Sequence, residues 1–78
     1  MDYKQLALEI LESVCETDEV REDLDMDLFE AGLMDSLSSI NVILEIEKKM
    51  GIKLQITDLE RSDISSVNNF EKFLRSKG

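Results

Sequence analysis

The sequence contains no histidine, proline or tryptophan, and only one of its 78 residues, Cys15, is a cysteine. Without histidine, the usual near-neutral proton shuttle and the commonest metal ligand are both missing. A single cysteine cannot form a disulfide within the chain and is consistent with a reducing compartment. Because Cys15 sits among apolar neighbours in a helical pattern, we expect a buried, inert thiol rather than a nucleophile.

Basic residues are scarce: nine Lys and Arg stand against 18 Asp and Glu, which gives a net charge of −9. Binding to nucleic acid needs a basic face, so nucleic acid is excluded as a partner, and anionic membrane is disfavoured for the same reason. A basic protein partner is favoured, because opposite charges speed the encounter. An acidic surface that only keeps the protein soluble is the alternative.

No apolar stretch is long enough to span a bilayer, and the N-terminal residues lack the basic and apolar regions of a secretory signal. We therefore expect a cytoplasmic protein with no stable membrane insertion. A chain of 78 residues has room for one core only, so we expect a single domain over residues 1–78. We also expect a monomer.

Apolar residues recur at helical spacing in three stretches, with a long acid-rich loop between the first two. The alternating pattern over 52–56 predicts an extended connector, because no second strand is available to pair with it. The expected fold class is therefore all-α: a small bundle of three main helices plus one short helix. The expected helices span residues 2 to about 17, 35 or 36 to 50, 57–61, and about 66–75.

Capping signals mark several of these helix ends. Asp2 precedes Gln5 with the spacing of a capping box, and Thr57 precedes Glu60 with the same spacing. Gly51 can take the left-handed cap position after the second helix.

The acid-rich loop has acids at the spacing of some metal sites. Asp23, Asp25 and Asp27 alternate as ligands do at the start of an EF-hand loop. That loop requires Gly at its sixth position and Glu at its twelfth, and Leu28 and Met34 stand there instead. The spacing indicates a solvated acidic loop, and we expect no metal site.

Catalytic groups are not apparent either. A helical domain of this size has little room for a deep dry cleft, and no carboxylate pair stands out for acid–base work. We expect no catalytic residues and no enzyme activity.

The second helix has more apolar residues than one buried face needs. With Ile43, Ile46 and Met50 inward, Val42 falls at the edge of the buried face. A surplus apolar stripe beside acids suits a transient docking surface, whereas a helix buried on two sides is the alternative. The stripe consists of Leu37, Ile40 and Leu44, bordered by Asn41 and Glu45 and followed by Glu47 and Lys48.

Ser36 has two interpretations. Asp35 and Ser36 before an apolar helix form an ordinary N-cap, and on these residues alone that interpretation is favoured. A helix start also offers free N–H groups and a positive dipole end, which suit a phosphate. A phosphodiester on the Ser36 hydroxyl is therefore physically apt.

The stretch Phe29–Leu37 resembles the attachment motif of acyl and peptidyl carrier proteins, which centres on Asp-Ser-Leu with a Gly a few residues upstream. The resemblance covers essentially the whole chain, including its length, acidity, long first loop and short third helix. It implies a carrier that catalyses nothing. Such a carrier holds an acyl or aminoacyl group as a thioester on a 4′-phosphopantetheine group (the arm) attached to Ser36.

The resemblance also implies partners. A phosphopantetheinyl transferase would add the arm from coenzyme A, with Asp35 assisting its metal site. An adenylating ligase or acyltransferase would load the arm, and a downstream acyl-accepting enzyme would unload it. Asn41 departs from the resemblance, since an acid often stands there in fatty-acid carriers. We expect partner recognition at Asp35, Leu37, Ile40, Asn41, Leu44, Glu45 and Glu47.

Phe29–Ser36 is similar to the motif of the D-alanyl carrier family of teichoic acid modification, which often reads Phe-Glu-Glu-Gly-Leu-Leu-Asp-Ser. Asp58, Glu60 and Arg61 resemble the acid and Arg of that family's short third helix. The chain departs from the family over Ile64–Val67, where aromatic and proline residues are usual. D-alanine is therefore one candidate cargo, and a fatty acyl, other aminoacyl or polyketide-type intermediate is another. An unmodified helical adaptor that binds one protein partner is an alternative of a different class.

Overall fold

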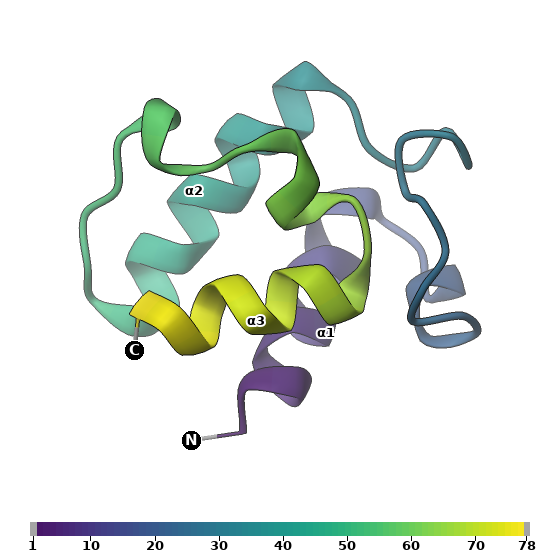
Figure 1. Ribbon diagram of the computed structural model, residues 1–78, viewed down its shortest axis with the longest axis horizontal. Helices are drawn as coiled ribbons and strands as arrows, with labels where there is room; N and C mark the ends of the chain where they lie inside the picture. Colours follow the sequence, from purple (N-terminus) through teal and green to yellow (C-terminus); the bar gives the residue numbers. More distant parts are fainter. Residues whose placement is uncertain (1, 78) are drawn as a thin grey trace.

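The computed structural model describes residues 2–77, and for Ile56 the course of the backbone only. Within this range there is no strand, so the predicted all-α class is confirmed. None of the helices in this range has the length and apolar character needed to cross a membrane. In Figure 1, α3 lies in front, with α1 and α2 behind it and the long α1–α2 loop at one side. The elements are α1 (Tyr3–Cys15), η1 (Glu19–Arg21), α2 (Ser36–Met50), η2 (Ile56–Asp58), η3 (Arg61–Ile64) and α3 (Val67–Lys77), where η denotes a 3₁₀ turn.

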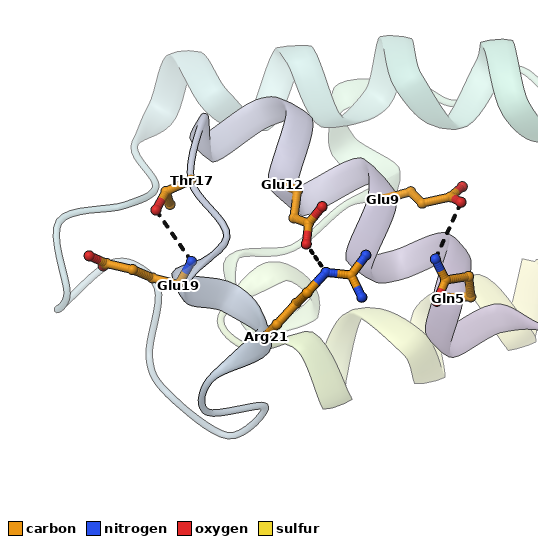
Figure 2. Close-up of polar contacts among 6 residues, drawn as sticks. All are labelled: Gln5, Glu9, Glu12, Thr17, Glu19 and Arg21. Carbon is orange, nitrogen blue, oxygen red and sulfur yellow. Dashed lines mark hydrogen bonds and ion pairs between the residues drawn. The ribbon is translucent and has the colours of Figure 1, made fainter.

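Helix α1 begins where the cap residue Asp2 indicates. Asp2 Oδ1 accepts a hydrogen bond from the Gln5 N–H at 3.1 Å. The side chain of Gln5 does not return to Asp2 but donates to Glu9 at 3.4 Å (Figure 2). The N-cap is therefore confirmed, while only half of the expected capping box forms.

The end of α1 comes earlier than expected. The helix stops at Cys15, because Glu16 adopts a left-handed conformation with φ 56°. Thr17, the expected end, instead accepts a hydrogen bond from the Glu19 N–H at 3.3 Å (Figure 2). The turn η1 follows at Glu19, and the sequence pattern did not predict it.

The long loop between α1 and α2 is folded onto the bundle. Val20 and Leu28 are fully buried. The Leu28 N–H donates to the carbonyl of Ser65 at 2.7 Å. Arg21 forms an ion pair with Glu12 of α1, as Figure 2 shows. The loop is therefore fastened to the helices at several points before it reaches α2.

Side chains from all three helices and the loop form one core, built around the fully buried ring of Phe70. The inward residues expected of the last helix are all buried, and Ser66 Oγ accepts a hydrogen bond from the Asn69 N–H at its start. Each large aliphatic in such a core contributes roughly 1.5–3 kcal/mol of burial free energy. The core includes Ile10, Leu11, Val20, Leu28, Val42, Ile46, Ile64, Val67, Phe70, Phe73 and Leu74.

The connector after α2 is extended, as its alternating pattern indicates. Ile52 and Leu54 are half-buried and pack against the core, while Lys53 and Gln55 between and after them are exposed. The side chain of Ile56, which we expected on the same inward side, lies outside the described residues.

The short helix expected over 57–61 is wrong in both position and type. Two 3₁₀ turns, η2 and η3, lie on either side of Leu59 and Glu60. The Asp58 carboxylate accepts the Gln55 N–H at 2.9 Å, and the Asp63 carboxylate accepts the Glu60 N–H at 2.9 Å. Each acid thus closes its own tight turn, and the chain does not wind into one longer helix.

Candidate functional site

At the start of α2, the helix cap and the expected attachment site are two different residues. Asp35 is the N-cap: its Oδ1 accepts hydrogen bonds from the Ser38 N–H at 2.9 Å and the Ser38 hydroxyl at 3.1 Å. Ser36 is the first helical residue and is exposed. Among the described residues, no side-chain hydrogen bond engages its hydroxyl. Asp35 therefore caps the helix and leaves the Ser36 hydroxyl free for chemistry.

The hydrogen bonds from Ser38 also set the charge of Asp35. They favour the ionised carboxylate, and the backbone N–H bond is the largest cause of the lowered pKa of Asp35. The side chain is fully exposed, so a partner can reach it. An anionic, accessible carboxylate therefore stands directly before the free serine hydroxyl.

The segment that leads into α2 is held by hydrogen bonds from its backbone N–H groups. Asp27 Oδ1 accepts the Phe29 N–H at 2.9 Å, and Gly32 adopts a positive φ of 77° that reverses the chain. The carbonyl of Leu28 then accepts the N–H of Met34 at 3.1 Å. Since Leu28 and Met34 are both buried, Ser36 is carried on an anchored turn.

The outer face of α2 carries three exposed aliphatic side chains. Leu37 is 73% exposed, Ile40 45% and Leu44 49%, and these three residues are called the α2 stripe below. The alternative of a helix buried on two sides is therefore excluded.

The inner face of α2 differs from the expectation at two residues. Ile43 and Ile46 are buried as predicted. Val42, expected at the edge, is fully buried, and Met50, expected inward, is only half-buried. The buried face is thus turned slightly toward Val42, which brings the α2 stripe squarely to the outside.

Polar residues border the α2 stripe on both sides. At 3.6 residues per turn, Asn41 and Glu45 follow one edge and Glu47 lies on the other. Asn41 is exposed, whereas Glu45 and Glu47 are half-buried. The structure therefore brings all the predicted recognition residues together on α2 and its cap.

A further group of residues beside Ser36 was missed by sequence reasoning. An open hollow of about 350 Å³ lies between the start of α2 and the η2–η3 segment. It includes Arg61, whose guanidinium carbon lies 4.4 Å from the centre of the Phe29 ring. These residues are far apart in the sequence, and only the fold brings them to Ser36. The hollow is lined by Phe29, Met34, Asp35, Ser36, Ser39, Leu59, Glu60, Arg61 and Ile64 and is called the Ser36 hollow below.

The other candidate groups have structural roles. Cys15 is half-buried rather than buried, and burial raises the pKa of its thiol. In the loop, the Asp23 carboxylate accepts the Asp25 N–H at 3.0 Å, and the Asp27 carboxylate accepts the Phe29 N–H. No cluster of three metal-ligating side chains occurs among residues 2–77.

Comparison with known proteins identifies the family of the chain. Residues 5–74 match the family model described as the phosphopantetheine attachment site. The chain is 38% identical over 69 residues to a D-alanyl carrier protein of Bacillus velezensis, which covers 88% of each chain. It is 37% identical over 67 residues to D-alanyl carrier proteins of Bacillus cereus and Bacillus anthracis, which covers 86% of this chain and 85% of those proteins.

The match includes all of α2, most of α1 and α3, and the loop that leads to Ser36. Carrier proteins of this kind interact with the transferases that attach the arm and with the ligases or acyltransferases that load it. They catalyse no reaction themselves. The chain therefore belongs to the phosphopantetheine-attachment family, whose members are non-catalytic carriers with a covalently attached 4′-phosphopantetheine.

Proposed function

We propose that this carrier protein holds D-alanine as a thioester on a 4′-phosphopantetheine arm attached to Ser36 and presents it for teichoic acid modification. The cargo is supported by the relatives, which are named D-alanyl carrier proteins and align over most of both chains. The attachment point is supported by one structural observation above all. Ser36 presents an exposed, unengaged hydroxyl directly after an ionised Asp35.

The attachment step uses the Ser36 hydroxyl as the nucleophile. Its oxygen forms a bond to the phosphorus of coenzyme A that carries pantetheine, and the phosphoanhydride bond breaks. Adenosine 3′,5′-bisphosphate leaves, and a base of the transferase takes the hydroxyl proton. The Asp35 carboxylate can bind the transferase's metal ion or a basic side chain. Once bound, the arm supplies the thiol that carries the cargo.

The α2 stripe serves as the docking surface for successive partners. Burying each of its three aliphatic side chains yields roughly 1.5–3 kcal/mol before the costs of association. Those costs consume much of the gain, so each complex is short-lived. A short-lived complex suits a carrier that must leave its loading ligase and move to an acyl-accepting enzyme.

The proposal extends to the domain organisation, the location and the partners of the protein. We propose a single carrier domain over residues 1–78 that acts as a monomer in the cytoplasm. An adenylating ligase activates and loads the cargo, and a downstream acyl-accepting enzyme removes it. The acidic surface, with a net charge of −9, favours partners with basic faces.

Intact-mass analysis tests the attachment. The protein is incubated with coenzyme A and a broad-specificity phosphopantetheinyl transferase. The wild type and Ser39→Ala should gain one phosphopantetheinyl mass, because Ser39 lies on the same helix but is only half-exposed. Ser36→Ala should gain none. An unmodified wild type, in an assay that modifies a control carrier, would support the unmodified adaptor instead.

The cargo is tested on the modified protein. A D-alanine-activating ligase should form a thioester with D-alanine in preference to L-alanine, other amino acids and fatty acyl donors. Equal loading with fatty acyl groups by an acyltransferase would contradict the D-alanyl assignment while leaving the carrier role intact.

A further inference from the structure

Acidic and basic residues are separated along the chain. Fourteen of the 18 acids lie at or before Glu47, and seven of the nine basic residues lie at or after Lys48. In Figure 1 the acid-rich loop lies at one side of the molecule, and the ends of α2 and α3 lie at the other. Helix α2 therefore runs from an acidic end of the molecule to a basic one.

Lys48 continues the α2 stripe toward the basic end. It follows Leu44 by four residues and Leu37 by eleven, which places it within about 40° of both around the helix axis. Its neighbour Lys49 is about 120–180° from the three residues of the stripe. Both lysines are exposed. Lys48 therefore belongs to the surface that carries the stripe, whereas Lys49 does not.

The surroundings of Lys48 agree with this placement. An open groove of about 210 Å³ lies between the end of α1 and the second half of α2, and both Leu44 and Lys48 line it. The groove shares no residue with the Ser36 hollow. Leu44 and Lys48 thus form adjoining parts of one surface, away from the attachment site. The groove is lined by Ser13, Val14, Glu16, Asn41, Leu44, Glu45 and Lys48.

The charge of Lys48 is available to a partner. Among residues 2–77 the ion pairs are those of Arg21 with Glu12 and of Arg75 with Glu71, so no acid in this range holds Lys48. At 1.5 Å per residue, Lys48 lies about 18 Å along the helix from Ser36. This exceeds the screening length of about 8 Å at physiological salt, so the two ends of α2 present separate charges.

A surface with this arrangement fits a partner whose charges are reversed. The partner would be basic opposite Asp35, apolar opposite the stripe and acidic opposite Lys48. Opposite charges in matching positions speed the encounter and fix its orientation. A partner that is basic along its whole docking face would place a like charge against Lys48 and be disfavoured. Lys48 can therefore distinguish one class of partner from another.

The loading ligase is the partner that needs this distinction. A broad-specificity transferase modifies many carriers and so relies on the neighbourhood of the serine. The ligase determines which carrier receives its cargo, and it must reject carriers that serve other pathways. A recognition residue far from Ser36 suits the ligase better than the transferase.

We propose that Lys48 is a specificity-determining residue of the docking surface and pairs with an acidic side chain of the ligase that loads D-alanine. This inference rests on the proposed function. Because Lys48 is about 18 Å from Ser36, it acts on the recognition of the carrier and not on the chemistry at the attachment site.

The kinetics of loading test this pairing. Each protein is first given its arm by the transferase, and complete attachment is verified by mass. Lys48→Glu should lower kcat/KM of a D-alanine-activating ligase about tenfold, mainly through KM, whereas Lys48→Arg should retain most of it. Raising the salt concentration from about 0.1 M to 1 M shortens the screening length from about 10 Å to 3 Å and should close most of the gap.

Lys49→Glu is the matched control. It changes the net charge by the same amount and removes a cation from the same last turn of α2, so both variants lose a similar interaction with the helix dipole. Their melting temperatures should fall equally. Lys49→Glu should nevertheless be loaded at close to the wild-type rate. The transferase should attach the arm to both variants as fast as to the wild type.

The outcomes separate this inference from the proposed function. If the wild type gains no arm, or gains it and is not loaded with D-alanine, the proposed function fails and the pairing fails with it. If the wild type is loaded and Lys48→Glu is loaded equally fast or faster, only the pairing is overturned. Equal slowing of Lys48→Glu and Lys49→Glu overturns it as well, because net charge and not position then sets the rate.

Discussion

Asn68 Nδ2 lies 2.6 Å from Asp25 Oδ1, in a hydrogen bond between residues 43 positions apart. The backbone N–H of Asn68 donates to the carbonyl of Leu24 at 3.1 Å. The first turn of α3 therefore holds the acid-rich loop by both side chain and backbone. Since the same loop leads to Ser36, the position of the attachment site depends on α3.

This pair can be tested by exchanging its members. Asn68→Asp places a second carboxylate beside Asp25, which removes the hydrogen bond and adds repulsion. It should lower the free energy of unfolding in urea by about 1 kcal/mol and speed hydrogen exchange at the Leu28 amide. The double variant Asp25→Asn with Asn68→Asp restores a donor and an acceptor and should recover most of the loss. If the double variant is as unstable as Asn68→Asp, the side chains are not coupled.

Replacing leucine by alanine at a buried and at an exposed position distinguishes a contribution to stability from a contribution to docking. Leu74→Ala truncates a fully buried side chain and should cost about 2–5 kcal/mol. That is a large share of the roughly 5–15 kcal/mol that is typical for a whole domain. Leu37→Ala, at a residue that is 73% exposed, should change the unfolding free energy by less than about 0.5 kcal/mol.

The exposed leucine should matter for the reactions with partner enzymes. Leu37→Ala should lower kcat/KM of the transferase or of the loading ligase about tenfold, which corresponds to roughly 1.4 kcal/mol of lost contact. Unfolding in urea and steady-state kinetics supply the two readouts. A Leu37→Ala protein that is modified and loaded at wild-type rates would falsify the α2 stripe as a docking surface.

The free energy of unfolding should depend on pH through the carboxylate of Asp35. Hydrogen bonds from Ser38 lower the pKa of Asp35 in the folded protein. The stabilisation is thus fully present above the unfolded value of about 3.9 and is lost as the pH falls through the folded pKa. Asp35→Asn retains an N-cap acceptor but does not titrate. The wild type should be the more stable of the two at pH 7, and the difference should close below about pH 3.9.

Urea midpoints of both proteins from pH 7 to pH 2 measure this difference. The Asp2→Asn variant is a comparison at the cap of α1, where the carboxylate accepts one backbone hydrogen bond. If the difference in urea midpoint between the wild type and Asp35→Asn is constant from pH 7 to pH 2, ionisation of Asp35 does not contribute to stability.

The two left-handed helix ends should respond in opposite directions. Gly51 closes α2 at φ 70°, with open space where a Cβ would be, so Gly51→Ala should destabilise through backbone strain alone, by about 1–2 kcal/mol. Glu16 closes α1 at φ 56° with a side chain present, so Glu16→Gly should raise stability by up to about 1 kcal/mol. Thermal unfolding of the two variants measures both signs. A loss in Glu16→Gly would show that its side chain matters more than its φ.

Much of the fold could be predicted because its helices are amphipathic and well capped. α2 begins and ends where Asp35 and Gly51 indicate, and α3 buries the four residues that its spacing points inward. The α2 stripe was identified as surplus to one buried face. Its exposure could not be predicted, because it depends on whether another element covers that face.

The region between α2 and α3 was the least predictable. The spacing of Thr57 and Glu60 resembles a capping box, but Asp58 and Asp63 each bind a backbone N–H three residues earlier. Short 3₁₀ turns have little periodicity, so these local hydrogen bonds decide the course of the chain. Consequently the sequence did not reveal that Arg61 would be placed near Ser36.

Cys15 has a consequence for the cargo. Burial raises the pKa of its thiol, so at neutral pH the group is largely protonated and a weak nucleophile. A thioester carried by the same molecule is therefore protected from self-acylation, in which the protein's own sulfur would capture the activated group. The half-buried position of Cys15 therefore disfavours its competition with the arm's thiol for the activated group.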